Sequence, residues 1–346
     1  GLAAGDELLA LTGQLHVAPG ATGQPTLLPS LLNARCQVLH RSNLVQMASD
    51  AAQARALVTE FDLQALLPLA VAQHGFALAG LGDPEALEVA AALAELDADS
   101  ARTASAITRA TYFIAAEQHA DVVEIFSALR ASGSGTGIGM YWQHDLAESA
   151  LRCGDTTLAK EAYDEFAAIA AAQVRPWFGA AMARLDGHFS EDLDDAVSHY
   201  DRAIALFFEA GYPIAAARAS YSCGVRLRRG RRRGQARQYL EQARGLFLPA
   251  GLARAAERCS VELEACGVPR RADAAADASS VLTPQELQVA RWVAKGESYQ
   301  SIAGRLFVSP RTIESHLTAI YRKLGVKGRA ELAARALADA SLLAPA

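Results

Sequence analysis

The sequence lacks any apolar run of the roughly 18 to 20 residues that a bilayer-spanning helix requires. It also lacks the charged segment and following apolar core that open a secretory signal. We therefore expect a cytoplasmic protein without a membrane partner. The first residue is glycine rather than methionine, so we expect the chain to be a piece of a longer protein.

Cysteine is scarce, and its pattern excludes two classes of site. The five cysteines are odd in number and form no C-x-x-C pair; they lie at positions 36, 153, 223, 259 and 266. This pattern predicts reduced, mostly buried thiols rather than disulfides or a zinc site. The eight histidines show no H-E-x-x-H spacing, and no G-x-S-x-G motif occurs. We therefore expect no enzyme activity, no metal and no cofactor.

Aromatic residues are also few, at 7% of the 346 residues, and runs of alternating β-branched residues are missing. Alanine, leucine and glutamate dominate instead, a composition typical of helices. The length allows two or three domains with ample cores. The composition therefore predicts an all-α fold.

Between about residues 50 and 266, helix-forming segments recur in pairs. In three of them a helix ends near a glycine, a short turn follows, and the next helix carries an alanine with tyrosine or leucine four positions later. These alanines, at positions 159, 196 and 236, are 37 and 40 residues apart. Helix pairs of this period resemble tetratricopeptide repeats. A nonrepetitive helical bundle is the alternative.

The charge of the chain is divided unevenly. From residue 282 onward, nine lysines and arginines face five acids, a net charge of +4, whereas the whole chain carries −5. Residues 1–281 therefore carry −9. A small cationic segment behind an acidic body is typical of a local phosphate-binding surface.

Three closely spaced helices are predicted in this cationic segment. Thr283 and Glu286 form a capping box ahead of the first. Ser298 caps a second, shorter helix, and Ser309 opens the third, with a proline at its first position. Two helices joined by about three residues, the second polar and basic outside, form a helix-turn-helix arrangement.

The third helix has two faces of different chemistry. An apolar stripe recurs at steps of four, three and four and consists of Ile313, Leu317, Ile320 and Leu324. The other stripe is polar in its middle and cationic at its ends, and consists of Arg311, Ser315, Thr318 and Arg322. Such a face offers short side chains to base edges and cations to phosphates. An ordinary solvated helix face is the alternative.

These stripes assign roles to single residues. We expect base edges to be faced by Glu314, Ser315 and Thr318. We expect phosphates to be held by Ser309, Arg311, Thr312, His316, Arg322 and Lys323. For His316, packing at the rim of the helix bundle is an equal alternative. A fourth helix, from about 328 to 343, would supply the contact of a homodimer on DNA through Leu332, Ala336 and Leu343.

The motifs of this segment resemble the DNA-binding domain of LuxR-type regulators, also called the FixJ or NarL type. They are L-T-x-x-E at 282–286, A-x-G at 294–296, I-A-x-x-L at 302–306, V-S-x-x-T-I-x-x-H at 308–316 and I-x-x-K-L-G-V at 320–326. The resemblance implies a four-helix domain that binds double-stranded promoter DNA. One position departs from the family, because Glu314 stands where many members carry lysine. A carboxylate there could accept from a cytosine amino group or face solvent, so no relative's base preference is transferred.

The region before this domain resembles the last helical repeats of large regulators of the MalT or LAL kind. The resemblance is carried by residues 221–267 and by W-x-x-D-L-A-E-x-A-L at 142–151. It implies a tetratricopeptide-like sensor or interaction domain over residues 1–268, a linker over 269–281 and the DNA-binding domain over 282–346. It also implies a nucleotide-switch domain, yet no G-x-x-x-x-G-K-[ST] motif occurs. We interpret the glycine-rich stretch 132–139, which has no lysine, as a flexible connection.

Seven arginines lie within twelve residues, at positions 226, 228, 229, 231, 232, 233 and 237. They are suited to the DNA backbone, or to a solvated turn between repeat helices that pairs with acids such as Glu241, Asp194 or Asp195. We favour the turn, because the family resemblance places this run inside a repeat.

These features together predict a sequence-specific transcription activator, associated with the nucleoid and with RNA polymerase as a further partner. Two alternatives remain open. One is a repeat scaffold that binds peptides or partner proteins in its concave face. The other is the distal part of an ATP-hydrolysing switch.

Overall fold

The computed structural model describes residues 27–96, 98–133 and 141–268, followed by a C-terminal part with gaps. In that part it describes residues 282, 284–294, 299–306, 313, 317, 318, 320, 321, 323, 324, 326, 328, 331 and 332. The chain divides into two compact units, Gly1–Val268 and Pro269–Ala346, called here the helical unit and the C-terminal unit. Helices are the regular structure of every described segment, which confirms the all-α prediction.

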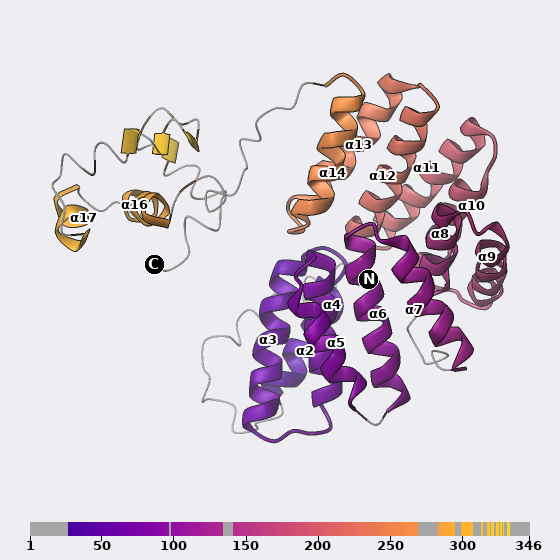
Figure 1. Cartoon of the computed structure of the whole chain (residues 1–346), viewed down its shortest axis with the longest axis horizontal. Coiled ribbons are helices and arrows are strands. Elements are labelled where there is room, and N and C mark those ends of the chain that lie inside the picture. Colours follow the sequence, from indigo (N-terminus) through magenta and orange to yellow (C-terminus); the bar gives the residue numbers. More distant parts are fainter. Residues whose placement is uncertain are drawn as a thin grey trace. The chain divides into compact units, whose positions relative to one another are not determined.

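The helices of the helical unit follow one another along the chain with short turns between them, so that neighbours pack as antiparallel pairs (Figure 1). Their bounds are α2 (Leu27–Leu39), α3 (Leu44–Glu60), α4 (Leu67–Leu81), α5 (Glu85–Ala94), α6 (Asp99–Ala115), α7 (His119–Ala131), α8 (Gln143–Cys153), α9 (Thr156–Ala171), α10 (Pro176–Phe189), α11 (Leu193–Glu209), α12 (Pro213–Arg229), α13 (Arg233–Phe247) and α14 (Ala253–Ala265). No helix among the described residues is long and apolar enough to cross a membrane.

The three predicted repeats are helix pairs, α8/α9, α10/α11 and α12/α13. Their recurring alanines, Ala159, Ala196 and Ala236, are fully buried at the start of the second helix of each pair. Small residues let the paired helices approach closely, because a methyl group at Gly187 would lie 2.9 Å from the Tyr200 ring. The pairing follows the predicted period, while its interpretation as tetratricopeptide-like stays a prediction.

Glycine and aspartate residues mark the ends and the starts of several of these helices. α8 ends at Gly154, whose φ of +83° is a left-handed conformation that glycine adopts without steric cost. The next residue, Asp155, accepts a hydrogen bond from the backbone N–H of Leu158 at 2.9 Å and so caps α9. Asp192 caps α11 in the same way. The glycine-rich segment that we interpret as a connection lies, for residues 134–140, outside the described part.

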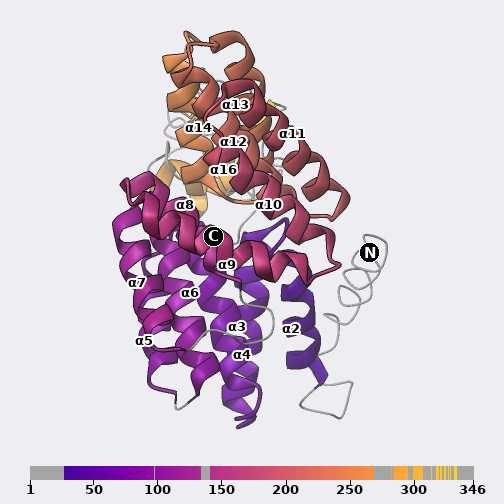
Figure 2. The same ribbon diagram turned by 90° about the vertical axis from the view of Figure 1, so that its right-hand side faces the viewer.

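The helical unit closes on itself, which the repeat pattern did not predict. The backbone N–H of Leu44 donates to Ala250 O at 3.2 Å, and that of Ile214 donates to Arg41 O at 3.2 Å. Residues of α2 and α3 share one apolar core with residues of α12, α13 and α14. The first helices of the unit thus pack against its last ones, as Figures 1 and 2 show for the indigo and orange ribbons.

A buried ionic network lies inside the helical unit. Arg184 of α10 donates to Glu148 of α8 at 2.6 Å, and both side chains are almost fully buried. Arg218 of α12 donates to Asp145 of α8 at 2.9 Å. Burial alone would raise the pKa of Glu148, but Arg184 and further cations around it hold that pKa well below its usual range. The network therefore ties three helix pairs together through charges that compensate one another.

The arginine run spans the end of α12, the turn between the helices and the start of α13, so the predicted turn lies inside it. α12 ends at Arg229 and α13 begins at Arg233. Arg232 pairs with Asp194, one of the acids expected, and Arg228 pairs with Glu262, which was not. Arg226 donates to the backbone carbonyl of His188 in α10, and Arg237 donates to that of Cys266, directly after α14. Four of the seven arginines therefore form ion pairs or hydrogen bonds within the helical unit.

The cysteines are free thiols, as predicted, and four of the five are buried. Burial raises the pKa of Cys36, Cys223 and Cys259 to about 12. These thiols are therefore protonated at neutral pH and unreactive as nucleophiles. Cys153, at the end of α8, is exposed.

Candidate nucleic-acid interface

The first helix of the C-terminal unit, α16 (Pro284–Ala294), supplies one wall of its core. Val289, Ala290 and Val293 are buried, as is Leu282 just before the helix. Val289 lies four residues before Val293, so helical spacing places both on the same buried face. Thr283, the predicted cap, lies outside the described residues.

The second helix, α17 (Tyr299–Leu306), is short and places Ile302 and Ala303 in the same core. Tyr299 packs against that core from its edge. Ser298, expected to cap the helix, lies outside the described part of the chain.

The described residues of the third helix confirm the predicted apolar stripe. Its four members, Ile313, Leu317, Ile320 and Leu324, are all buried in the core formed with α16 and α17. Residues 313, 317, 318, 320, 321, 323 and 324 have helical conformation. One face of this helix is therefore fixed by packing against α16 and α17.

Two predicted contact residues are described, and both are exposed. Thr318 lies about 130° around the helix from the middle of the buried stripe, at 100° per residue. Lys323 lies about 90° from that stripe on the other side. Its Nζ donates to Glu286 Oε2 of α16 at 2.6 Å, a pair across 37 residues that the sequence did not reveal. Lys323 is thus held near the edge of the face assigned to phosphate.

The remaining residues of the predicted interface lie outside the described part of the chain. They are Ser309, Arg311, Thr312, Glu314, Ser315, His316 and Arg322. Their assignments stay predictions based on helical spacing.

Leu332 corrects one expectation for the dimer contact. Its side chain is fully buried in the core of its own unit, and its backbone N–H donates to Gly328 O at 3.0 Å in a helical pattern. A side chain without exposed surface cannot contact a second copy. Ala336 and Leu343, the other expected contacts, lie outside the described residues.

Comparisons with known proteins agree with this arrangement. Residues 280–336 match the family described as bacterial regulatory proteins, luxR family. A protein of Mycobacterium bovis named as a candidate HTH-type transcriptional regulator is 55% identical over 51 residues, which are 15% of this chain and 6% of that protein. The oxygen regulatory protein NreC of Staphylococcus aureus is 43% identical over 61 residues, which are 18% of this chain and 28% of that protein.

The chain therefore spans only a small part of these relatives, and the residues that match the family lie in the C-terminal unit. Within that unit, the core, the order of the helices and the family match coincide. The chain carries at its C-terminal end a helix-turn-helix domain of the LuxR family of bacterial regulatory proteins.

Proposed function

We propose that this protein regulates transcription by binding specific promoter sequences through its C-terminal unit, and that it acts as an activator. The observation that carries the proposal is the third helix, whose apolar stripe is buried while Thr318 and Lys323 remain exposed within a LuxR-family domain. The net charge of +4 from residue 282 onward supplies attraction to phosphates.

In this mechanism Thr318 faces base edges together with Glu314 and Ser315. Phosphates are held by Ser309, Arg311, Thr312, His316, Arg322 and Lys323, which set the register of the domain on DNA. Because a single domain of this size buries little surface, two copies would bind neighbouring half-sites as a homodimer. We assign the contact between copies to Ala336 and Leu343, and no longer to the buried Leu332.

The helical unit would provide the input, by binding a signal molecule or a partner protein. Support comes from its closed array of helices, which is joined in one chain to a DNA-binding domain. A cytoplasmic location near the nucleoid and contact with RNA polymerase complete the proposal.

Selection of bound duplexes from a random-sequence pool, followed by affinity measurements over a salt series, tests DNA binding. We expect Arg311→Ala with Arg322→Ala to weaken binding to every sequence and to lower the salt slope by about 0.9 for each phosphate that the protein no longer neutralises. The matched control is Arg229→Ala with Arg233→Ala, which removes two exposed arginines from the facing ends of α12 and α13. Unchanged DNA affinity in the Arg311 and Arg322 double variant would contradict the proposed interface. Weaker binding in the control would show that the arginine run contacts phosphates.

Activation is tested separately, with a reporter gene behind the selected sequence. We expect Thr318→Ala to reduce reporter expression together with affinity for the selected site, since it removes a group assigned to a base edge. Reporter expression that rises when the protein is absent would identify a repressor instead.

A further inference from the structure

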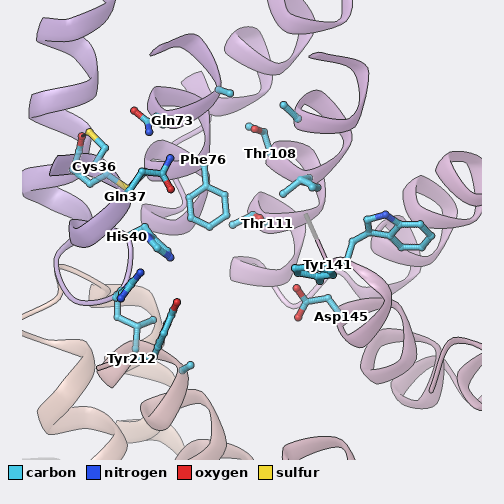
Figure 3. A pocket seen from close by; sticks show the side chains of 18 of the residues that line it. Cys36, Gln37, His40, Gln73, Phe76, Thr108, Thr111, Tyr141, Asp145 and Tyr212 are labelled. Carbon is cyan, nitrogen blue, oxygen red and sulfur yellow. Dashed lines mark hydrogen bonds between the residues drawn. The ribbon is translucent and has the colours of Figure 1, made fainter. Parts of the chain in front are cut away.

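The helical unit contains a cavity of about 420 Å³, partly open to solvent, between its first helices and α8, α10 and α12. Helices α2, α4 and α6 line one side, and α8, α12 and the start of α10 line the other. Figure 3 shows side chains from both sides converging, with Gln37, His40 and Phe76 opposite Tyr141 and Asp145. Cavities that hold small organic molecules typically have volumes of about 300 to 1,000 Å³.

Part of the cavity wall is apolar. Phe76, Ile107 and Phe126 contribute hydrocarbon surface from α4, α6 and α7. The rings of Tyr141, Trp177 and Tyr212 add flat surfaces from the opposite side. Such a wall is suited to an organic body that it can bury against aromatic and aliphatic groups.

The charged groups of the wall have a clear excess of one sign. Arg41, Arg175 and Arg218 face a single acid, Asp145. Asp145 is compensated, because it accepts from Arg218 at 2.9 Å and lies 3.7 Å from Arg184. Among the described residues, neither Arg41 nor Arg175 forms an ion pair with an acid, so two uncompensated cations remain.

Arg41 is held at this wall by its surroundings. Its guanidinium lies over the Tyr212 ring, 4.6 Å from the ring centre, and its Nε is buried with no hydrogen-bond partner among the described residues. A buried donor without an acceptor is costly, and an anionic ligand would offset that cost. Neighbouring His40 adds no charge, because burial and then the nearby Arg41 lower its pKa to about 4.

Two further polar side chains of the wall have unmet hydrogen-bonding capacity. Gln73 is 5% exposed and donates to Asn33 O at 3.0 Å, but its Oε1 has no partner in the described structure. His144, 9% exposed, likewise has an Nδ1 without a partner there. The wall therefore combines apolar surface, positive charge and unused polar groups, the pattern of a built binding site.

We propose that this cavity binds a small organic anion, a carboxylate with an apolar body, as the signal that the helical unit transmits to DNA binding. The carboxylate would pair with Arg41 and Arg175, and the body would lie between Phe76 and the Tyr141 and Trp177 rings. An organic cation fits less well, since Arg41 already covers Tyr212 and Asp145 already pairs with Arg218. The signalling part of this inference rests on the proposed function, whereas the binding part stands without it.

Calorimetric titration of the full chain with matched probes tests the site. Hexanoate and 4-phenylbutanoate are compared with the amine and the alcohol of the same carbon skeletons, each at up to millimolar concentration. We expect at least one carboxylate to bind and its amine and alcohol counterparts to bind at least about tenfold more weakly. Failure of both carboxylates to bind, or equal binding of an amine or alcohol, would overturn the proposal.

Variants locate the bound anion. Arg41→Gln and Arg175→Gln should each weaken carboxylate binding about tenfold or more, because each removes a hydrogen bond between charged groups. Arg175 is exposed, so its replacement leaves the fold intact even if Arg41→Gln disturbs it. Arg202→Gln, an exposed arginine of α11 outside the cavity, is the matched control and should bind normally. Normal binding by the Arg175 variant would show that the carboxylate does not bind at this site.

DNA affinity, measured with and without the bound carboxylate, separates the two proposals. A change in affinity that Arg175→Gln abolishes would support the signalling role. Unchanged affinity would overturn that role while leaving DNA binding in place. If the chain bound no DNA in either condition, the proposed function would fail whatever the titrations showed.

Discussion

Lys323 Nζ lies 2.6 Å from Glu286 Oε2, so the third helix of the C-terminal unit is joined to α16 by an ion pair beside the face assigned to DNA. Glu286 is nearly buried, whereas Lys323 is about one-third exposed. If the proposed interface holds, DNA phosphate would compete with this carboxylate for the lysine.

Glu286→Gln should release Lys323 for phosphate contact. We expect DNA affinity at low salt to rise a fewfold and the salt slope to steepen by up to about 0.9, the effect of one further neutralised phosphate. Stability of the unit should fall by about 1 kcal/mol, as is usual for a partly exposed ion pair. Fluorescence anisotropy with labelled DNA over a salt series measures both affinity and slope.

Glu331→Gln is the charge-matched control for that experiment, because it removes an exposed acid of the same unit. Equal gains in affinity from the two variants would show that net charge alone accounts for the effect. Lys323 would then have no specific role at the phosphate.

Leu332→Ala should destabilise the C-terminal unit by about 2 to 5 kcal/mol, the usual cost of truncating a buried leucine. Faster hydrogen exchange in peptides from α16 and α17 would report this destabilisation, because these helices share the core with Leu332. Sedimentation of the still-folded variant should show the same self-association as the parent chain. If the variant lost its dimers without faster hydrogen exchange, Leu332 would be a dimer contact after all.

The helical unit should lose stability in mild acid. Burial lowers the pKa of His188 to about 3 and that of His40 to about 4, so the folded state keeps both neutral while the unfolded state takes up protons below about pH 6.5. Stability should therefore fall as pH drops from about 6.5 towards 4, by at most about 1.4 kcal/mol per pH unit for each histidine. Urea unfolding at a series of pH values measures the slope.

His188→Gln should flatten that slope, because it removes one of the titrating groups. His199→Gln, at a more exposed histidine of α11, is the control and should leave the slope closer to that of the parent chain. If the dependence of stability on pH were unchanged in the His188 variant, His188 would not be the neutral buried group described above.

Gly224→Ala should destabilise the helical unit, because the new methyl group would lie 2.6 Å from Leu240 Cγ and 3.3 Å from Ala236 O. We expect the free energy of unfolding to fall by about 1 to 3 kcal/mol from overpacking, despite the better helix propensity of alanine. Gly245→Ala, on the exposed side of α13 with nothing within 4 Å, should instead gain about 0.5 to 1 kcal/mol. Thermal unfolding compares the two, and equal effects would show that α12 and α13 do not approach closely at Gly224.

Local periodicity explains what could be predicted. The stripe of Ile313, Leu317, Ile320 and Leu324 follows from the helical repeat alone, and so does the burial of Ala159, Ala196 and Ala236. The sequence motifs of the C-terminal unit, fixed in order and spacing, indicated the LuxR family before any contact was known.

Contacts between distant residues could not be predicted in this way. The pair of Glu286 with Lys323, the closure of α2 and α3 on the last helices, and the cavity lined by Arg41 and Arg175 each join segments far apart in sequence. Periodicity shows which face of a helix is buried but not against which partner. Leu332 illustrates the difference. We expected it at a contact between two copies, but its side chain is buried in the core of its own unit.

The hydrogen bonds from Leu44 to Ala250 and from Ile214 to Arg41 alter how the helical unit should fold. An open array of repeats gains stability unit by unit, and its ends fray independently. A closed array instead requires contacts between residues roughly 170 to 200 positions apart, which are slow to form because of their loop-closure cost. The unit should therefore melt in one cooperative transition, and it should not tolerate removal of a terminal helix pair as an open solenoid would.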